Sequence, residues 1–208
     1  MVNIEMKEKI NRIFSVVALS VLLLQILLFV LSWIITATNP DLCVRSLLGG
    51  EGIRWFIGGY VNSQTNFILV WILMLSISLG AVKRSGLSAA MRRLGRLGFR
   101  ERLALRFVSV ELIVFLIILF LLTCVPHAVL LNVAGYIYPG SFSTGLVPLL
   151  SFALCVFAVT YHNVAANNFS LSEMFGLLTY GVSAAAPVFI LYLLISCLYH
   201  SVCFVFML

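Results

Sequence analysis

Glu111 is the residue with the best prospect of doing chemistry, because it is the one acidic side chain inside a long apolar block of this sequence. It lies about one turn into the block that starts at Phe107, five residues after Arg106. A charge buried in lipid costs several kcal/mol, so carboxylates at such positions commonly serve an ion or substrate pathway. A carboxylate that pairs with Arg102 or Arg106 near the membrane surface is the competing interpretation.

The histidines and cysteines show no pattern of a metal or catalytic site. The histidines stand at block ends or late in the last block: His127, His162 and His200. The cysteines lack metal-type spacing and are expected to be small packing residues: Cys43, Cys124, Cys155, Cys197 and Cys203. No nucleophile elbow, P-loop or dinucleotide fingerprint is present. We therefore expect no enzyme, no metal and no cofactor.

Long apolar blocks must position these side chains. Apolar residues make up 62% of the 208 positions and charged residues 10%, whereas soluble domains have about 25% charged. This predicts an all-α, polytopic integral membrane protein, a single membrane domain over 1–208 with about five transmembrane helices. The predicted spans are 13–35, 65–82, 107–125, 141–161 and 175–200.

Two spans carry further detail. Gln25 and Ser32 are seven residues apart on one face of the first span, so they are predicted to hydrogen-bond between helices. The last block, 175–208, would be about 51 Å long as one helix, against a hydrocarbon core of about 30 Å. With Gly181 and Pro187 inside it, we expect a broken or tilted helix, or a helix followed by a re-entrant tail.

The positive charge indicates orientation and not nucleic-acid binding. The net charge is +6, but the basic residues flank apolar blocks, eight of them between Lys83 and Arg106. Cytoplasmic loops collect Lys and Arg, so the N-terminus and the 83–106 loop are predicted inside and the 39–63 loop outside. We expect a multi-pass protein of the inner (plasma) membrane. The first block exceeds the usual length of a signal peptide core and is expected to stay as an anchor.

Two stretches outside the spans are predicted to form interfacial amphipathic helices. In 49–67, glycine pairs bracket a short apolar run, with Trp55 and Tyr60 at headgroup level. In 85–100, Ser85 is a plausible N-cap and one face is apolar. The other face is basic and is expected to set topology and to touch anionic lipid through Arg92, Arg93, Arg96 and Arg100.

The same two stretches resemble the AbgT family, the p-aminobenzoyl-glutamate transporters. In that family a Leu-Leu-x-x-Glu-Gly-x-Arg-Trp loop leads into a span that ends in Gly-x-Ala-(Glu/Lys)-(Arg/Lys)-Ser-Gly-Leu. The matching residues of the loop are Leu47, Leu48, Glu51, Gly52, Arg54 and Trp55. Those after the span are Gly80, Lys83, Arg84, Ser85, Gly86 and Leu87. A fainter similarity runs over 149–204, so that together about half of the chain resembles the family.

The resemblance implies transport of p-aminobenzoyl-glutamate or a related small organic anion through inverted repeats and helical hairpins. The polar hairpin that should follow the third span is absent, and the chain is less than half as long as family members, so no substrate ligand is transferred. We expect a reduced relative that transports, or one that has become a membrane scaffold or accessory subunit. The expected partners are the lipid bilayer and a second copy or a second membrane subunit, with no nucleic acid.

Overall fold

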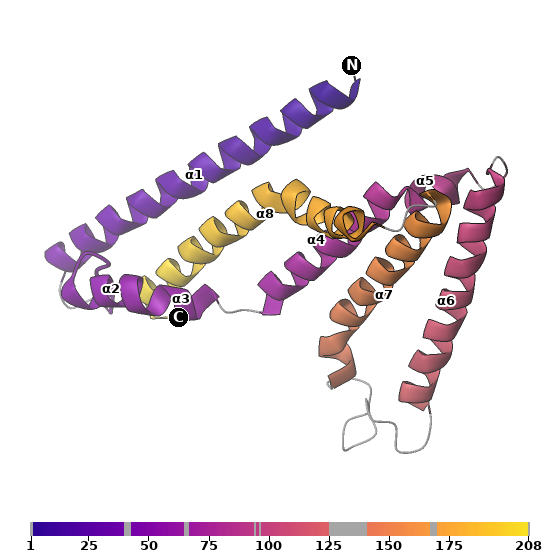
Figure 1. Cartoon of the computed structure of the whole chain (residues 1–208). Helices are drawn as coiled ribbons and strands as arrows, with labels where there is room; N and C mark the ends of the chain where they lie inside the picture. The colour runs from indigo at the N-terminus through magenta and orange to yellow at the C-terminus, as the bar shows by residue number, and fades with distance from the viewer. Residues whose placement is uncertain are drawn as a thin grey trace. The chain divides into compact units, whose positions relative to one another are not determined.

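The structure is a computed structural model of the chain, which describes residues 2–39, 43–64, 67–93, 95, 97–124, 141–166 and 170–207. Nine helices follow one another in this part of the chain (Figure 1). They are α1 (Val2–Thr38), α2 (Gly50–Arg54), the π-helix η1 (Trp55–Gly59), α3 (Tyr60–Gln64), α4 (Phe67–Ser85), α5 (Leu87–Arg92), α6 (Phe99–Cys124), α7 (Ser141–Ala166) and α8 (Leu171–Phe206).

Five of these helices are long and apolar enough to cross a membrane: Glu8–Thr38 of α1, then Phe67–Ser85, Phe99–Thr123, Gly145–Ala166 and Leu171–Phe206. Leucine, isoleucine, valine and phenylalanine dominate their surfaces and remain exposed, which only a hydrocarbon solvent makes favourable. The all-α, five-span prediction is confirmed.

The helix α8 shows that the prediction of a break or a re-entrant tail in the last block is wrong, while the alternative of a tilted helix stays a prediction. It runs without interruption from Leu171 to Phe206 although Pro187 lies inside it. A proline removes one hydrogen bond of the helix, but within apolar surroundings the flanking turns still satisfy their own backbone groups, which favours continuing the helix. Thirty-six residues correspond to about 54 Å of helix.

The described helices divide into two compact units, which are described separately. Unit 1 comprises Met1–Leu69 with Ala186–Leu208, and unit 2 comprises Val70–Ala185. The single-domain prediction for 1–208 stays a prediction. The border in α8 lies next to Pro187.

In unit 1 the segment from α2 to α3 packs on α1 and on the end of α8. The ring of Trp55 stacks on that of Phe204 with centroids 4.7 Å apart, and Phe56 meets Phe29 edge to face at 5.3 Å. The backbone N–H of Arg45 donates to the carbonyl of Val205 at 3.0 Å. The predicted short helix of the 49–67 stretch is therefore present, longer than its apolar run, and held by aromatic contacts.

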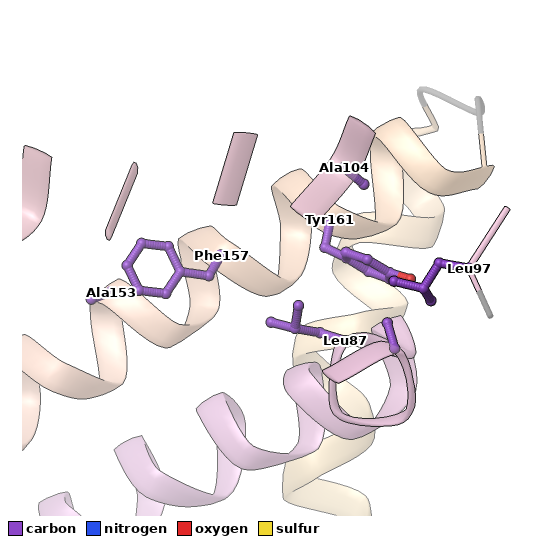
Figure 2. Packing of buried hydrophobic residues seen from close by; sticks show 7 residues of the cluster. Leu87, Leu97, Ala104, Ala153, Phe157 and Tyr161 are labelled. Atoms are coloured by element: carbon purple, nitrogen blue, oxygen red, sulfur yellow. The ribbon is translucent and has the colours of Figure 1, made fainter. Parts of the chain in front are cut away.

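In unit 2 the helices α6 and α7 pack along each other as a hairpin, with α5 against α7 (Figure 1). The buried side chains between them form one cluster, which includes Leu87, Leu97, Phe157 and Tyr161. Figure 2 shows Leu87 and Leu97 around the ring of Tyr161, with Phe157 one turn away on α7. This cluster fixes α5 and the start of α6 on one end of α7.

The start of α6 explains why this helix is longer than the predicted 107–125 span. The carboxylate of Glu101 accepts a hydrogen bond of 2.9 Å from the backbone N–H of Gly98, and Gly98 accepts the first helical bond, from Arg102. A glutamate three residues after the cap satisfies an otherwise unpaired donor. The helix consequently begins two turns before the apolar block.

The basic amphipathic helix is shorter than predicted. Its N-cap is Gly86, at φ 84°, and not Ser85, which is the last residue of α4. The left-handed backbone favours glycine there. The helix α5 ends at Arg92, Arg93 follows it and Arg100 belongs to α6, while Arg96 lies outside the described residues. The four arginines thus do not share one helix, and their surface role stays a prediction.

Candidate functional site

Glu111 lies near the middle of α6 and faces α7 within unit 2. Its Oε1 accepts a hydrogen bond of 2.6 Å from the hydroxyl of Thr160 on α7. Such a short bond is typical of a hydroxyl donating to a carboxylate. The hairpin of α6 and α7 brings the two residues together across 49 positions of sequence.

The second carboxyl oxygen of Glu111 is the less usual feature. Oε2 is buried and has no hydrogen-bond partner among the described residues. An unpaired buried polar atom costs about 1–3 kcal/mol, and more where the group is charged. An atom of this kind therefore requires a partner that the described residues do not provide.

Glu111 is the one polar residue in a groove between the two helices. The groove has a volume of about 280 Å³, and its apolar lining includes Val114, Phe115, Phe152 and Phe157. An apolar surrounding strengthens the interaction of a carboxylate with any cation that reaches it, because water does not screen the charge.

The alternative pairing of Glu111 with an arginine is absent from the structure. Arg102 donates through Nε to the carbonyl of Leu97 at 3.0 Å, so it fastens the start of its own helix. The ion pair that joins helices in the described part of unit 2 is instead His162 Nε2 to Glu173 Oε2, at 3.6 Å. Glu111 is thus held by Thr160 and not by a surface salt bridge.

Sequence reasoning found Glu111 but missed Thr160. Threonine is common in membrane helices, where it donates to a carbonyl three or four residues back, as Thr179 does to Phe175. Nothing in the local sequence separates Thr160 from such a residue. Thr160 is recognised as a partner of Glu111 only from the packing of α6 against α7.

A second hollow lies at the end of α7, where the second family motif is located. Its volume is about 350 Å³, and Ser85 and Gly86 line it together with Arg93, Glu101 and His162. The hollow combines cationic, acidic and hydroxyl groups, so it is suited to polar solutes and not to lipid chains.

In unit 1 a line of polar side chains connects α1, α8 and α3. Gln25 donates through Nε2 to the hydroxyl of Ser201 at 2.9 Å, and the Cys197 side chain is hydrogen-bonded to Ser201 and to Tyr60. Burial, followed by the neighbouring Cys197, raises the pKa of Tyr60 above its ordinary value of 10.0. The interhelical role predicted for Gln25 is confirmed.

Ser32 bonds to a turn of the chain and not to a second helix. It is 1% exposed, and its hydroxyl accepts a hydrogen bond of 3.2 Å from the backbone N–H of Leu47. The prediction of a hydrogen bond between helices is therefore wrong for Ser32, which packs against the segment before α2 instead. This hydrogen bond holds the backbone segment that leads into α2 against α1.

The residues that carry the family resemblance have structural roles in both units. A Cβ on Gly52 would overlap the carbonyl of Ser46 and the backbone of Leu47, so only glycine fits there. Leu87 is 4% exposed in the core of unit 2. Of the others, Glu51 and Arg54 lie exposed on α2. None of these motif residues lines the Glu111 groove.

The remaining candidates do not gather into a metal site. Among the described residues no three His, Cys, Asp or Glu side chains lie together. Cys43 is exposed, and Cys155, Cys197 and Cys203 are half-buried free thiols. His127 and the side chain of Cys124 are outside the described part, and His200 packs its ring against Tyr199 in α8.

No family model, no curated protein and no solved structure matches this chain. The class of this protein therefore follows from its helices and their apolar surface alone. Five helices of sufficient length and apolar composition make this chain a multi-span helical membrane protein that resides in a lipid bilayer.

Proposed function

We propose that this protein is a relative of the AbgT family that moves a small organic anion across the membrane, coupled to a cation held at Glu111. The observation that carries the proposal is the Oε2 atom of Glu111, which is buried in an apolar groove without a partner in the described chain. A small cation, a proton or sodium, would supply the missing contact.

The chemistry of the pair supports a cation in preference to other ligands. The carboxylate of Glu111 and the hydroxyl of Thr160 offer hard oxygen atoms, which protons and alkali cations prefer. Secondary transporters place coupling ions on such oxygens inside the membrane, and Glu111 lies within the candidate span Phe99–Thr123. No bond of the solute is made or broken in this proposal, so the protein acts without being an enzyme.

The polar hollow at the end of α7 gives the proposal a place for the solute. Arg93 and His162 line it, and both are able to attract an anion. The hollow also contains Ser85 and Gly86 of the motif that resembles the AbgT family.

Uptake into proteoliposomes tests the proposal. Purified protein is reconstituted, and accumulation of radiolabelled p-aminobenzoyl-glutamate is followed under an inward proton gradient, an inward sodium gradient and neither. We expect accumulation above the equilibrium level under one of the two gradients, and no accumulation without a gradient. Uptake equal to that of protein-free liposomes under all three conditions would contradict transport of this substrate class.

A membrane scaffold is the second candidate, and a specific observation favours it. Most hydroxyl groups in the described spans donate to carbonyls of their own helix, as Ser76 does to Leu73 and Ser109 to Arg106. Such groups need no water and line no aqueous path. A scaffold would leave Glu111 as a packing residue, which the Glu111 variants distinguish.

A further inference from the structure

We propose that the groove lined by α4, α5, α6 and α7 of unit 2 is a binding site for one anionic phospholipid, with its phosphate on Arg102 and Arg106 and an acyl chain along α6. This inference is independent of transport. It concerns a different groove from the one that contains Glu111, because the two grooves share only Phe157 among their lining residues.

The groove is large and apolar. Its volume is about 650 Å³, within the range of ligand-binding cavities, which extends over about 300–1,000 Å³. Leu105, Val108, Leu112 and Leu154 supply apolar walls, and Phe157 closes its floor. A hollow of this kind on a helix surface within a bilayer must be filled, because an empty apolar cavity forfeits the dispersion contacts of its lining.

The two cationic groups line this groove from the first two turns of α6. Arg102 and Arg106 are one helical turn apart on α6, so their side chains leave the helix on the same face. Both are exposed, and neither forms an ion pair with a described carboxylate. Two guanidinium groups one turn apart suit a phosphate, because each planar guanidinium can donate two parallel N–H bonds to the phosphate oxygens.

The length of the groove agrees with one lipid leaflet. From Arg102 to Leu112 the helix rises by about 15 Å. The hydrocarbon core is about 30 Å thick, so this distance is about half of it. Charge at one end and apolar side chains over one leaflet are the two features of a phospholipid. A soluble anion would use the arginines and leave the apolar walls uncovered, and a protein segment would not need the paired charges.

Native mass spectrometry of the full chain tests the inference. The protein is purified from nanodiscs that contain equal parts of phosphatidylcholine and phosphatidylglycerol, and the lipids that remain bound after mild delipidation are identified. We expect one retained phosphatidylglycerol in the wild type. The double variant Arg102→Gln with Arg106→Gln should lower retention about twenty-five-fold, about fivefold per arginine.

A matched control separates the groove from general surface charge. The double variant Arg92→Gln with Arg100→Gln removes the same charge from exposed positions outside the groove. It should retain phosphatidylglycerol as the wild type does. Equal loss in both double variants would overturn the inference, because retention would then depend only on net charge.

A third variant tests the proposed position of the acyl chain without changing the charge of the protein. Ser109 is exposed and lines the groove, and Ser109→Phe places a ring where the chain would lie. We expect it to lower retention of phosphatidylglycerol while circular dichroism and the elution volume stay unchanged. Undiminished retention in a folded Ser109→Phe protein, or preferential retention of phosphatidylcholine by the wild type, would contradict the site.

Discussion

Gly80 of α4 and Gly181 of α8 touch backbone to backbone in unit 2. A Cβ built on Gly80 would overlap the Cα of Gly181, and one built on Gly181 would overlap the carbonyl oxygen of Ser76. Ser76 and Gly80 are four residues apart, the spacing that brings small residues onto one face of a membrane helix. Neither helix can therefore keep this crossing with a larger residue at these positions.

The first prediction follows from this crossing. Gly181→Ala should destabilise the protein by about 1–3 kcal/mol, because the added methyl group forces the two helices apart. Gly145→Ala is the matched control, since a Cβ there meets nothing within 4 Å. It should be neutral or stabilising by up to about 1 kcal/mol, because alanine favours a helix over glycine. Unfolding in mixed micelles with increasing SDS measures both, and equal effects would contradict the crossing.

The hydrogen bond from Gln25 to Ser201 gives a second prediction. Ser201→Ala should cost about 1–2 kcal/mol, because it leaves the buried amide of Gln25 without its acceptor. The double variant with Gln25→Leu should lose less than the two single variants added together, by about 0.6–1.7 kcal/mol. A double-mutant cycle of unfolding free energies measures this coupling. Strict additivity would mean that the bond contributes nothing to unit 1.

Tyr60 provides a prediction on pH. Its pKa is raised, by burial first and then by Cys197, so between 10.0 and the raised value the folded state keeps a proton that the unfolded chain has lost. The unfolded state then binds fewer protons, and stability falls as the pH rises through this window. Melting temperatures between about pH 8 and pH 11 should show the fall, and Tyr60→Phe should reduce it. An unchanged slope in Tyr60→Phe would exclude Tyr60 as the cause.

The distribution of basic residues predicts the orientation. Ser88 lies in α5 within the basic segment, and Val61 lies exposed in α3. With the native thiols removed, Val61→Cys should react with an impermeant thiol reagent in whole cells, and Ser88→Cys only after the membrane is opened. The reverse labelling pattern would invert the proposed topology.

The sequence predicts the spans because hydrophobicity and length are local properties. The helix ends are less predictable: the start of α6 depends on Glu101 reaching back to Gly98, and the cap of α5 on the left-handed backbone of Gly86. A proline usually ends or kinks a helix, but α8 continues through Pro187. Membrane helices tolerate proline more readily than helices in water do.

Of the two hydrogen-bonded residues at the candidate site, only Glu111 is predictable from the sequence. Glu111 stands out because a carboxyl is rare in an apolar block, whereas Thr160 becomes significant only through the antiparallel packing of α6 and α7. The groove with Arg102 and Arg106 requires four helical segments to be assembled. Contacts between distant segments are a property of the fold, and hydrophobic periodicity does not encode them.

The coupling role of Glu111 is tested most directly by comparing two modes of transport in one set of proteoliposomes. Gradient-driven accumulation needs the cation site, whereas exchange of labelled for unlabelled solute at equal concentrations does not. Glu111→Gln should abolish accumulation and keep exchange, because it retains the shape of the side chain but removes the ionisable group. Glu173→Gln, at an exposed position in α8, should retain both modes. Full accumulation by Glu111→Gln would contradict the account and favour a packing role for this carboxyl.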